Sequence, residues 1–534
     1  MSLALICRVE LKLKSVKDIT ILWVDDEIEL LKPHIIFLEG KGYKVEPCNN
    51  AYDAIDMVRD THFDLVLLDE NMPGMSGLEA LSEIKSIDSA LPIVMITKSE
   101  EEDIMDEAIG KQISDYLIKP VNPKQILLTL KKHIDKKRLV SEKTTMAYQS
   151  KFGQMGMEIN DCRDFEDWMK MYRKLVFWEL ELANIEDSGM DEILRMQKTE
   201  ANNLFARFVK KNYLTWLDPD EENKPLMTPN IFKEKVYPLL DKGQKVAFIL
   251  IDNLRYDQWQ TLYPVINNYY TLEEDSMYFS ILPTATQYAR NSMFSGLMPL
   301  EIQRRYPDYW IDEDEETSKN LHEEDFIGFQ FKRHYKDYSY HYEKINNEKM
   351  GAKVLNNLTS ILNADLSVFV YNFVDMLSHA RTESEMIRDL AADEAAYRSL
   401  TLSWFEHSML LELIKKLSDQ GVKLIITTDH GSIRVQNPIK VIGDRQTNTN
   451  LRYKQGKNLN YKSKEVFEVT EPRKAQLPQV NVSSSYIFAF GEDFLAYPNN
   501  FNYYSSYYRN TFQHGGISLE EMVIPLITLS PREV

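Results

Sequence analysis

The chain has 534 residues, too many for one hydrophobic core, and this length predicts three units of ordinary domain size. Apolar residues make up 43% and charged residues 27%, a balance typical of globular proteins that excludes a disordered chain. A net charge of −19 disfavours non-specific binding of nucleic acid over the whole surface, although it leaves room for a local basic groove.

Membrane, secreted and disulfide-rich classes are disfavoured as well. No apolar run approaches the roughly 20 residues needed to cross a bilayer, so we expect no membrane insertion. Residues 1–15 lack a small-residue cleavage site and do not resemble a secretion signal. The three cysteines, Cys7, Cys48 and Cys162, are scattered without metal-ligand spacing. This usage fits a reducing compartment and predicts a cytoplasmic protein without disulfides.

Residues 18–136 alternate apolar strands with amphipathic helices, a pattern that predicts a parallel sheet in an α/β domain. Strands are expected at residues 19–24, 63–68, 91–96 and 115–118. The polar residues that end them are Asp25 and Asp26, Asp69, Thr97, and Lys119 before Pro120. Because these ends meet at one edge of the sheet, they predict an acidic pocket for a hard cation such as Mg²⁺, with a lysine to offset anionic charge.

The acid pair, the block DENMPGMSG at residues 69–77, Thr97 and Lys119 resemble the receiver domain of response regulators. The resemblance implies that Asp69 accepts a phosphoryl group from a sensor histidine kinase. It assigns Mg²⁺ to Asp26, Asp69 and the carbonyl of Asn71 with support from Asp25, the phosphoryl oxygens to Thr97 and Lys119, and the aromatic switch to Tyr116. The alternative is a receiver-like fold that has lost this chemistry.

Residues 137–239 change character and predict a helical bundle that links the two α/β regions. Residues 164–184 and 200–217 each place apolar and aromatic side chains on one helical face. A helix rich in Lys and Arg does not follow the receiver, so the usual DNA-binding output is not evident. We interpret the bundle as a structural spacer, with a partner-binding or dimer-transmitting module as the alternative.

Buried strands that run into acidic residues return in residues 240–534, which predicts a second α/β domain. Strands are expected at residues 245–252, 366–375, 424–428 and 522–529, with helices at 352–363 and 403–418 on the sheet faces. Residues 432–458 are polar and mixed and predict a loop, with a turn favoured at the Asn437–Pro438 step. The tyrosine-rich stretch with Tyr503, Tyr504, Tyr507 and Tyr508 is expected to form an insertion or lid over the site.

Acids and histidines stand at these strand ends, where ligands of α/β sheets bind, in combinations that suit zinc. The candidates for one zinc are Asp375, His379 and His514, and those for a second are Asp252, Asp429, His430 and Thr286. The spacing between Asp375 and His379 puts both on one helical face, or at a strand end and the following turn. Two metals about 3.5–4 Å apart clamp a displacement at phosphorus. The alternative is an unrelated scatter of core acids and histidines.

These ligands, in this order, resemble the alkaline phosphatase superfamily in its PglZ branch. Thr286 lies in LPTATQYAR, residues 282–290, where relatives have a threonine, serine or cysteine nucleophile after a Pro-Thr-x pattern. Thr284 is a rival for this role. A free hydroxyl is a weak nucleophile, so the attacking threonine needs activation by metal.

Three neighbouring positions bear on the resemblance. Asn253 follows Asp252 where many relatives have Gly, which leaves the local backbone geometry open. Arg290 and Asn291 are candidates to contact phosphoryl oxygens.

Receiver plus PglZ resembles the PorX-type response regulators of type IX secretion. The resemblance implies a zinc-dependent phosphodiesterase output that acts on nucleotides or oligonucleotides, with two Zn²⁺ in the output domain and Mg²⁺ in the receiver. Phosphorylation of Asp69 is expected to promote a homodimer, and a sigma factor or secretion component is an implied partner. The alternative is a non-enzymatic, zinc-stabilised docking module for a transcription or secretion partner.

Overall fold

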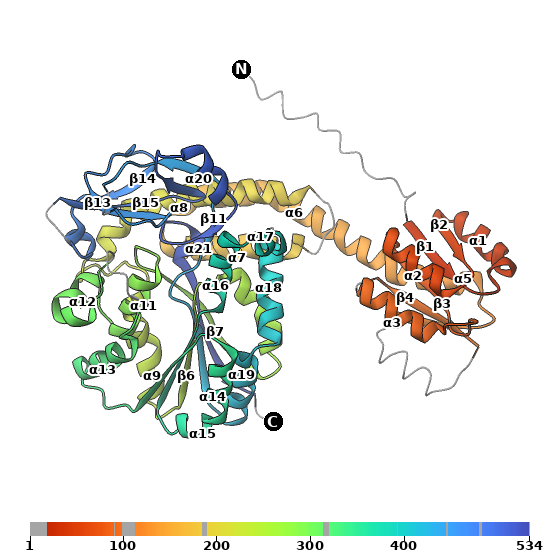
Figure 1. Cartoon of the computed structure of the whole chain (residues 1–534), viewed down its shortest axis with the longest axis horizontal. Coiled ribbons are helices and arrows are strands. Elements are labelled where there is room, and N and C mark those ends of the chain that lie inside the picture. Colours follow the sequence, from red (N-terminus) through yellow and green to blue (C-terminus); the bar gives the residue numbers. More distant parts are fainter. Residues whose placement is uncertain are drawn as a thin grey trace, which may run out of the picture. The chain divides into compact units, whose positions relative to one another are not determined.

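The computed structural model describes residues 19–89, 91–98, 113–183, 189–312, 320–391, 393–444, 447–479 and 483–532 (Figure 1). Cys7 and the predicted first residue of the receiver, Asp18, lie outside the described residues. The chain divides into two compact units between Ala147 and Tyr148. Among the described helices, none is both long and apolar enough to cross a membrane.

The first unit contains a five-stranded parallel sheet in the order β2-β1-β3-β4-β5. Its strands are β1 (Ile19–Val24), β2 (Tyr43–Cys48), β3 (Leu65–Asp69), β4 (Ile93–Thr97) and β5 (Asp115–Ile118). Four of them confirm the strands predicted from apolar runs. The sequence analysis missed β2, because this edge strand exposes Lys44 and contains Pro47 and so lacks a continuous apolar run.

Helices cover both faces of this sheet, where two separate apolar cores form. They are α1 (Lys32–Glu39), α2 (Ala51–Asp60), α3 (Gly77–Ile87) and α5 (Pro123–Leu130). The start of α3 is fixed by a capping box in which the side chains of Ser76 and Glu79 each accept from the other's backbone N–H. This capped turn directly follows the loop after β3.

Three long helices form the predicted bundle: α6 (Lys136–Asp161), α7 (Phe165–Ala183) and α8 (Met190–Trp216). The helix predicted at 164–184 is confirmed by α7, and that at 200–217 is the second half of α8. Phe205 of α8 packs its ring 5.5 Å from Trp168 and 6.0 Å from Phe279, so the bundle shares one core with the domain that follows.

The second unit is built on a six-stranded sheet in the order β7-β18-β10-β6-β9-β8. Its strands are β6 (Val246–Ile251), β7 (Tyr270–Phe279), β8 (Tyr340–Ile345), β9 (Leu366–Tyr371), β10 (Lys423–Thr427) and β18 (Val523–Pro531). Strands β10, β6, β9 and β8 are parallel, whereas β18 is antiparallel to both of its neighbours, β10 and β7. Five of these strands therefore end, and β18 begins, at the same edge.

Helices flank the sheet, with α11 and α13 to one side and α18 and α19 to the other (Figure 1). The longer ones are α10 (Tyr256–Ile266), α11 (Thr286–Ser295), α12 (Pro299–Arg305), α13 (Glu323–Arg333), α14 (Glu348–Asn356), α16 (Phe373–Glu383), α17 (Glu385–Leu390), α18 (Glu394–Glu406), α19 (Met409–Asp419) and α20 (Phe501–Tyr508), and the short ones are α9 (Tyr237–Leu240), α15 (Leu358–Ile361) and α21 (Leu519–Met522). The helix predicted at 403–418 is interrupted, because Ser408 caps the start of α19.

Two predictions about this domain were wrong. Asp375 does not end a strand: β9 stops at Tyr371, and Asp375 lies in the first turn of α16. Residues 432–458, predicted as a loop, contain the strands β11 (Ile433–Arg434), β12 (Asn437–Lys440) and β13 (Tyr453–Lys457). These strands pair with partners far along the chain, namely β17 (Phe512–Gln513), β16 (Asp493–Ala496) and β15 (Ser484–Ala489). The third partner, β15, also pairs with β14 (Val466–Val469).

Candidate functional site

The topology of the second unit gathers the predicted site residues at one edge of its sheet. Asp252 directly follows β6, and Asp429 and His430 follow β10. Strand β7 delivers the chain to Thr286 at the first position of α11, and His514 precedes β18, which begins at this edge. All of the residues predicted as zinc ligands therefore come from the polar rim beyond one set of strand ends.

Asp375, His379 and His514 form a group that we call the outer cluster. They can each offer one ligand atom, and these atoms lie within 4.8 Å of one another. Nε2 of His379 is 3.5 Å from Oδ2 of Asp375, and Nε2 of His514 is 3.6 Å from Oδ1 of the same carboxylate. The side chain of His379 is 61% exposed, so this cluster opens to solvent.

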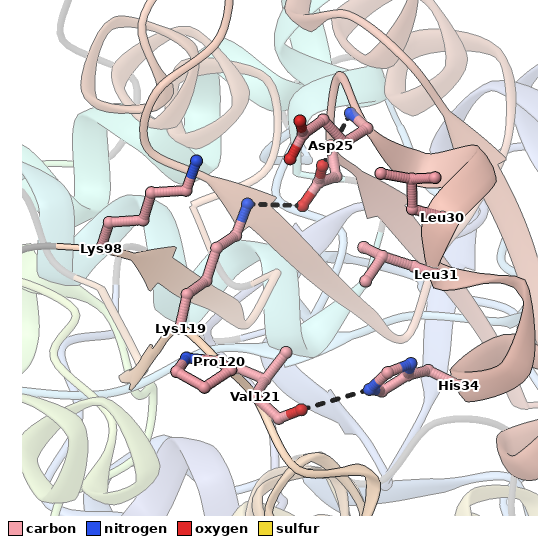
Figure 2. Close-up of a pocket in the computed structure, with 9 residues that line it drawn as sticks. Asp25, Leu30, Leu31, His34, Lys98, Lys119, Pro120 and Val121 are labelled. Carbon is pink, nitrogen blue, oxygen red and sulfur yellow. Dashed lines mark hydrogen bonds and ion pairs between the residues drawn. The ribbon is translucent and has the colours of Figure 1, made fainter.

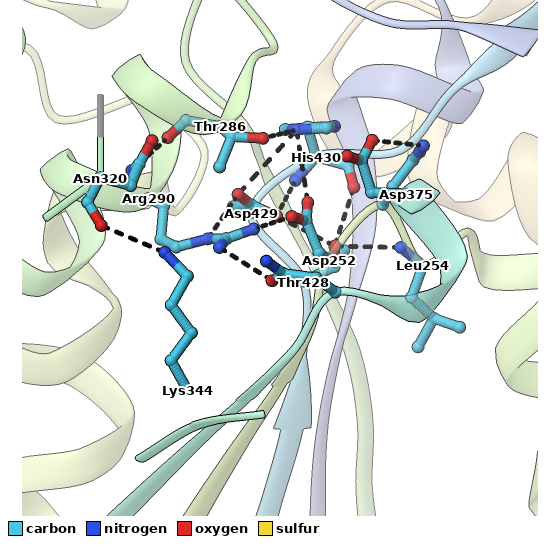
Figure 3. A network of polar contacts seen from close by, with 12 residues as sticks. Asp252, Leu254, Thr286, Arg290, Asn320, Lys344, Asp375, Thr428, Asp429 and His430 are labelled. Atoms are coloured by element: carbon cyan, nitrogen blue, oxygen red, sulfur yellow. Dashed lines mark hydrogen bonds and ion pairs between the residues drawn. The ribbon is translucent and has the colours of Figure 1, made fainter. Parts of the chain in front are cut away.

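Asp252, Asp429 and His430 form the inner cluster, whose ligand atoms also lie within 4.8 Å of one another and are all buried. Nε2 of His430 is 3.7 Å from Oδ1 of Asp252 and 3.9 Å from Oδ2 of Asp429. The hydroxyl of Thr286 is 3.0 Å from the same ring nitrogen (Figure 3). Thr286 thus faces the inner cluster from the start of α11.

The two clusters meet through their histidines. The rings of His430 and His514 stack with centroids 4.2 Å apart and planes inclined by 15°. Nδ1 of His430 is 3.2 Å from the carbonyl of Gly431, and Nδ1 of His514 is 3.2 Å from the carbonyl of Thr284. A carbonyl can only accept, so each Nδ1 carries the proton and donates. In its neutral form each ring therefore presents an unprotonated Nε2 to the clusters, as histidine ligands of metals usually do.

Arg290 links the carboxylates of the inner cluster from behind. Its Nε donates to Oδ2 of Asp429 at 2.9 Å, its Nη2 pairs with Oδ2 of Asp252, and its Nη1 lies 3.5 Å from Glu323 (Figure 3). The guanidinium is completely buried. Arg290 was expected to contact phosphoryl oxygens, but the carboxylates occupy its donors, so that expectation was wrong. The four-residue spacing from Thr286 would have indicated that both side chains point the same way.

Burial and charge act in opposite directions on these groups. Burial raises the pKa of Asp252 well above its usual range, against the pull of Arg290. Burial would also raise the pKa of Asp429, but Arg290 and His430 hold it at about 2. Burial and the neighbouring His430 lower the pKa of His514 to about 3. One buried arginine thus leaves the inner cluster short of positive charge, while the low pKa of His514 keeps that ring of the outer cluster neutral.

The donor set fits two divalent cations. Each cluster combines carboxylate oxygens with an imidazole nitrogen, the mixture that zinc prefers. Oδ1 of Asp252 is buried and, within the described part of the chain, accepts no hydrogen bond, although a buried carboxylate oxygen normally has a partner. That unused acceptor lies 3.7 Å from Nε2 of His430, so a cation bound by the inner cluster would satisfy it.

Asn253 and Gly431 fix the backbone beside these ligands. Asn253 adopts a left-handed conformation with φ 65°, which asparagine tolerates better than most residues, and its amide reaches Asp375 at 3.3 Å and Ser378 at 3.2 Å. At Gly431 an added Cβ would lie 2.0 Å from the carbonyl oxygen of Glu520. The glycine after Asp429 and His430 is therefore required by a close backbone approach.

Thr284, the rival of Thr286 for the role of nucleophile, has a structural role. The hydroxyl of Thr284 donates to the carbonyl of Gly516 at 2.9 Å and accepts from the N–H of Gly515 at 3.1 Å, in a completely buried position. Asn291, also suggested for phosphoryl contact, is buried and accepts from the amide of Asn320 at 3.2 Å. The same amide donates to the carbonyl of Thr286 at 3.2 Å. Thr286 is therefore the hydroxyl that faces the clusters.

The first unit brings its predicted residues together at the carboxyl ends of its strands. Asp25, Asp26 and Asp69 offer oxygens within 4.8 Å of one another, which fits a magnesium ion. Nζ of Lys119 lies 2.8 Å from both Asp25 and Asp69. Burial raises the pKa of Asp69, although Lys119 opposes this effect. An added Cβ at Gly77 would lie 2.3 Å from the carbonyl oxygen of Asp69, which explains the glycine that ends the DENMPGMSG block.

The remaining receiver residues lie around this group. Thr97 donates its hydroxyl to the carboxylate of Glu70, a buried partner that the sequence analysis missed. Asn71 lies in the exposed loop after β3, and Tyr116 is 40% exposed. A pocket of about 440 Å³ opens beside Asp25 and Lys119 and is walled by Leu30, Leu31, His34 and Val121 (Figure 2).

Comparison with known proteins identifies these parts. A family model described as the BREX system PglZ alkaline phosphatase-like domain matches residues 231–529, more than half of the chain. The chain belongs to the PglZ family. Two further models precede the PglZ domain: a response regulator receiver domain at residues 21–131 and a PorX response regulator linker domain at 138–217. The three together are the architecture of a PorX-type response regulator.

Curated relatives and solved structures resemble a smaller part of the chain than the family models cover. The transcriptional regulatory protein ZraR of Klebsiella oxytoca is 36% identical over 140 residues, 26% of this chain and 32% of the relative. ResD of Bacillus subtilis is 33% identical over 111 residues, 21% of this chain and 46% of the relative. The chain thus spans less than half the length of these relatives. A CheY-like receiver domain from Methanospirillum hungatei is 28% identical and covers 22% of this chain and 94% of its own, with a TM-score of 0.22.

These matches indicate the function of the chain in general terms. The PglZ protein is a two-component regulator with an alkaline-phosphatase-like output domain, which suggests a hydrolase of that superfamily. Its receiver domain implies a sensor histidine kinase as a partner.

Proposed function

We propose that the PglZ domain is a metal-dependent phosphodiesterase with Thr286 as its nucleophile, under the control of the receiver. The observation that carries this proposal is the position of the Thr286 hydroxyl, 3.0 Å from His430, whose ring stacks on His514 of the outer cluster. A weak nucleophile beside two groups of metal-ligating side chains is the arrangement that phosphoryl transfer requires.

In this proposal Asp375, His379 and His514 hold one zinc, and Asp252, Asp429 and His430 hold the other, with Thr286 as a further ligand of the second. When bound, two such cations activate the nucleophile and neutralise charge on the attacking and leaving oxygens.

The chain's own residues orient the reaction. Thr286 Oγ1 loses its proton to water and attacks phosphorus, and the ester bond to the leaving oxygen breaks. The leaving oxygen takes a proton from water, and a second water molecule then hydrolyses the phosphodiester formed on the threonine. The amide of Asn320, which holds the carbonyl of Thr286, fixes the first turn of α11. Arg290 holds the carboxylates of the inner cluster in place from the next turn of the same helix.

Two considerations favour diesters, such as those of nucleotides, over monoesters. The first is resemblance to nucleotide phosphodiesterases of the superfamily. The second is charge: Arg290 is paired with Asp252 and Asp429, and Lys344 lies 3.1 Å from Glu323. Cations that are already paired compensate the dianion of a monoester less well than the single charge of a diester.

The receiver completes the proposal. Phosphorylation of Asp69, with Mg²⁺ held by Asp25, Asp26, Asp69 and the Asn71 carbonyl, adds a dianion that attracts Lys119 and draws Thr97 away from Glu70. Tyr116 then moves as the switch, and the changed face favours a homodimer that tunes hydrolysis. By resemblance to PorX-type regulators, the protein acts in the cytoplasm in the control of type IX secretion, with a sigma factor or secretion component as a partner.

The experiment is hydrolysis of bis-p-nitrophenyl phosphate by the full chain. Thr286→Ala should lower kcat by about a thousandfold or more, as loss of a nucleophile does. Thr286→Ser, which keeps a hydroxyl, should retain much of the rate, and a chelator should abolish it. A wild-type chain without hydrolysis, whose Thr286→Ala variant still restores secretion, would instead identify the domain as a docking module.

Control by the receiver is tested with beryllium fluoride, a phosphoryl mimic. The expected result is a larger species in sedimentation and a changed rate of hydrolysis, both lost in Asp69→Ala. If beryllium fluoride binds and changes neither, the proposed coupling is wrong.

A further inference from the structure

Helix α20 carries four tyrosines that the proposed chemistry does not use. Tyr503 stacks on Tyr507 with centroids 6.1 Å apart and planes inclined by 16°, and Tyr504 stacks on Tyr508 at 6.1 Å and 15°. The two leading rings face solvent, with Tyr503 63% and Tyr504 39% exposed. Pairs of exposed, nearly parallel rings offer flat apolar faces that water solvates poorly.

Hydrogen bonds attach the helix to the segments that carry the metal-ligating residues. Tyr507 donates its hydroxyl to the carbonyl of Thr382 at 3.0 Å, in α16, less than one turn beyond His379. Gln513, the neighbour of His514, donates to the Thr382 hydroxyl at 3.3 Å. The row from Tyr503 to Tyr507 therefore ends beside the outer cluster, the one that opens to solvent.

The other side of α20 is anchored near the inner cluster. Tyr508 packs against an apolar core that contains Ile433 and Val435, a few residues beyond His430. Because both sides of the helix rest on ligand-bearing segments, the exposed rings have a fixed position relative to the site.

Positive charge accompanies the rings. The guanidinium carbon of Arg388 lies 5.3 Å from the centre of the Tyr507 ring, and its Nη2 donates to the carbonyl of Thr382 at 2.9 Å. Its buried Nε makes no hydrogen bond within the described part of the chain. At the start of the helix, Nζ of Lys440 lies 5.1 Å from the centre of the Phe501 ring. Aromatic faces between cations are the surface on which single-stranded nucleic acids bind.

We propose that α20 is a base-stacking subsite, on which Tyr503 and Tyr504 hold nucleotides of a single-stranded oligonucleotide whose phosphodiester lies at the clusters. The inference rests on the proposed function and specifies its substrate class. The bases stack on the tyrosines while Arg388 meets a phosphate on the way to the outer cluster. With a chain charge of −19, affinity comes from this local surface and not from the whole molecule.

The first test compares two substrates of the full chain, the hexanucleotide of thymidine and methyl p-nitrophenyl phosphate, a diester too small to reach α20. In the double variant Tyr503→Ala and Tyr504→Ala, KM for the hexanucleotide should rise about fivefold to 150-fold, since stacking of one base is worth about 1–3 kcal/mol. Values of kcat, and both constants for the small diester, should stay unchanged. The matched Tyr→Phe double variant keeps the rings and should behave as wild type.

Tyr335→Ala is the control for loss of an exposed ring. Tyr335 is 96% exposed and lies before β8, at the opposite edge of the sheet from the clusters. The Tyr335→Ala variant should leave KM for both substrates unchanged. Equal KM for the hexanucleotide in the wild type and the alanine double variant would overturn the inference, even if both hydrolyse it.

A binding measurement separates this inference from the proposed function. Fluorescence anisotropy of a labelled thymidine hexanucleotide is followed with Thr286→Ala, alone and combined with the alanine double variant. A loss of affinity of at least about fivefold on removing the rings supports the subsite even if no diester is hydrolysed. Unchanged affinity, or an effect of the rings on self-association alone, contradicts it.

Discussion

Arg290 shows how a single buried side chain sets the properties of the inner cluster. It neutralises part of the charge of Asp252 and Asp429 and turns the Oδ2 atom of each toward itself. The oxygen left over on Asp252 faces the histidine. Such partners of ligands orient them and tune their affinity for metal.

Replacing Arg290 with lysine should weaken metal binding in the PglZ domain by about 10-fold to 100-fold, because an ammonium cannot bridge two carboxylates in the planar geometry of a guanidinium. Competition with a chelator measures this affinity. The matched control is Arg398→Lys, which disturbs another buried arginine, paired with Glu179 and Asp257. It should lower stability and leave metal affinity unchanged; equal weakening in both variants would contradict the assigned role.

Gly431→Ala should damage the site through the backbone. The new Cβ would meet the carbonyl of Glu520, so the turn that carries His430 must shift. We expect a lower Tm and a loss of metal binding, measured by thermal unfolding and elemental analysis. The control is Gly243→Ala, at a glycine with nothing near its Cβ position but a φ of 74°, which should lower Tm and spare the metal. Unaltered metal content in Gly431→Ala would refute this reading of the glycine.

Asp257 should make stability depend on pH. Burial alone would raise its pKa, but Arg255 and Arg398 hold it well below the usual range. A carboxyl with a depressed pKa in the folded chain stabilises the fold above its unfolded pKa of about 3.9, and this contribution is lost as pH falls through the folded value. Asp257→Asn should therefore cost about 3–5 kcal/mol at pH 7, as breaking a buried pair does.

The measurement is urea unfolding of the wild type and Asp257→Asn at several pH values. The difference in unfolding free energy should persist at neutral pH and shrink below about pH 4. A difference that is the same at pH 3 and pH 7 would show that the charge of Asp257 is not the cause.

The positions of the site residues were predictable, but the contacts among them were not. Asp252, Asp429 and His430 follow apolar runs, and the rule that parallel strands end at one edge brings them together. The sequence does not show that Arg290 contacts carboxylates and not substrate. Nor does it show that the Thr284 hydroxyl is hydrogen-bonded to backbone groups of Gly515 and Gly516. The Arg290 assignment depends on a contact between residues 139 positions apart, and the Thr284 assignment on contacts that span 231 and 232 positions.

At the scale of elements, strands with a continuous apolar run were predicted well and edge strands were predicted poorly. β6, β9 and β10 are buried almost completely and their sequences are mainly apolar. β2, β11 and β12 carry polar residues and pair with the chain only at an edge or in two-stranded sheets. Their sequences lack the period that distinguishes strand from loop, so tertiary pairing decides their structure.

The shared core of α7, α8 and β7 leads to a prediction at this scale. Phe205→Ala should lower the free energy of unfolding of the second unit by about 3–5 kcal/mol, because the ring is completely buried against Trp168 and Phe279. Helices and sheet should unfold in one transition. Phe177→Ala, at a ring that is 53% exposed, should change stability by about 0.5 kcal/mol or less. A separate transition for the helices would contradict a common core.

At the scale of the whole molecule, a receiver unit and a unit with a candidate metal site share one chain, joined within α6. Each unit has its own cores and its own cluster of carboxylates. Local sequence patterns predicted both units. How phosphorylation in one changes the other depends on the relative stability of alternative assemblies, which no local pattern encodes.

The proposed function depends most on the capacity of the inner and outer clusters to hold two cations beside Thr286. Elemental analysis of the purified full chain, after dialysis that removes weakly bound Mg²⁺, measures this directly. We predict about two zinc ions per chain, reduced by His514→Ala and by Asp429→Asn and unchanged by Asp69→Ala. If the chain folds but binds no transition metal, even when zinc is supplied, the central claim is contradicted.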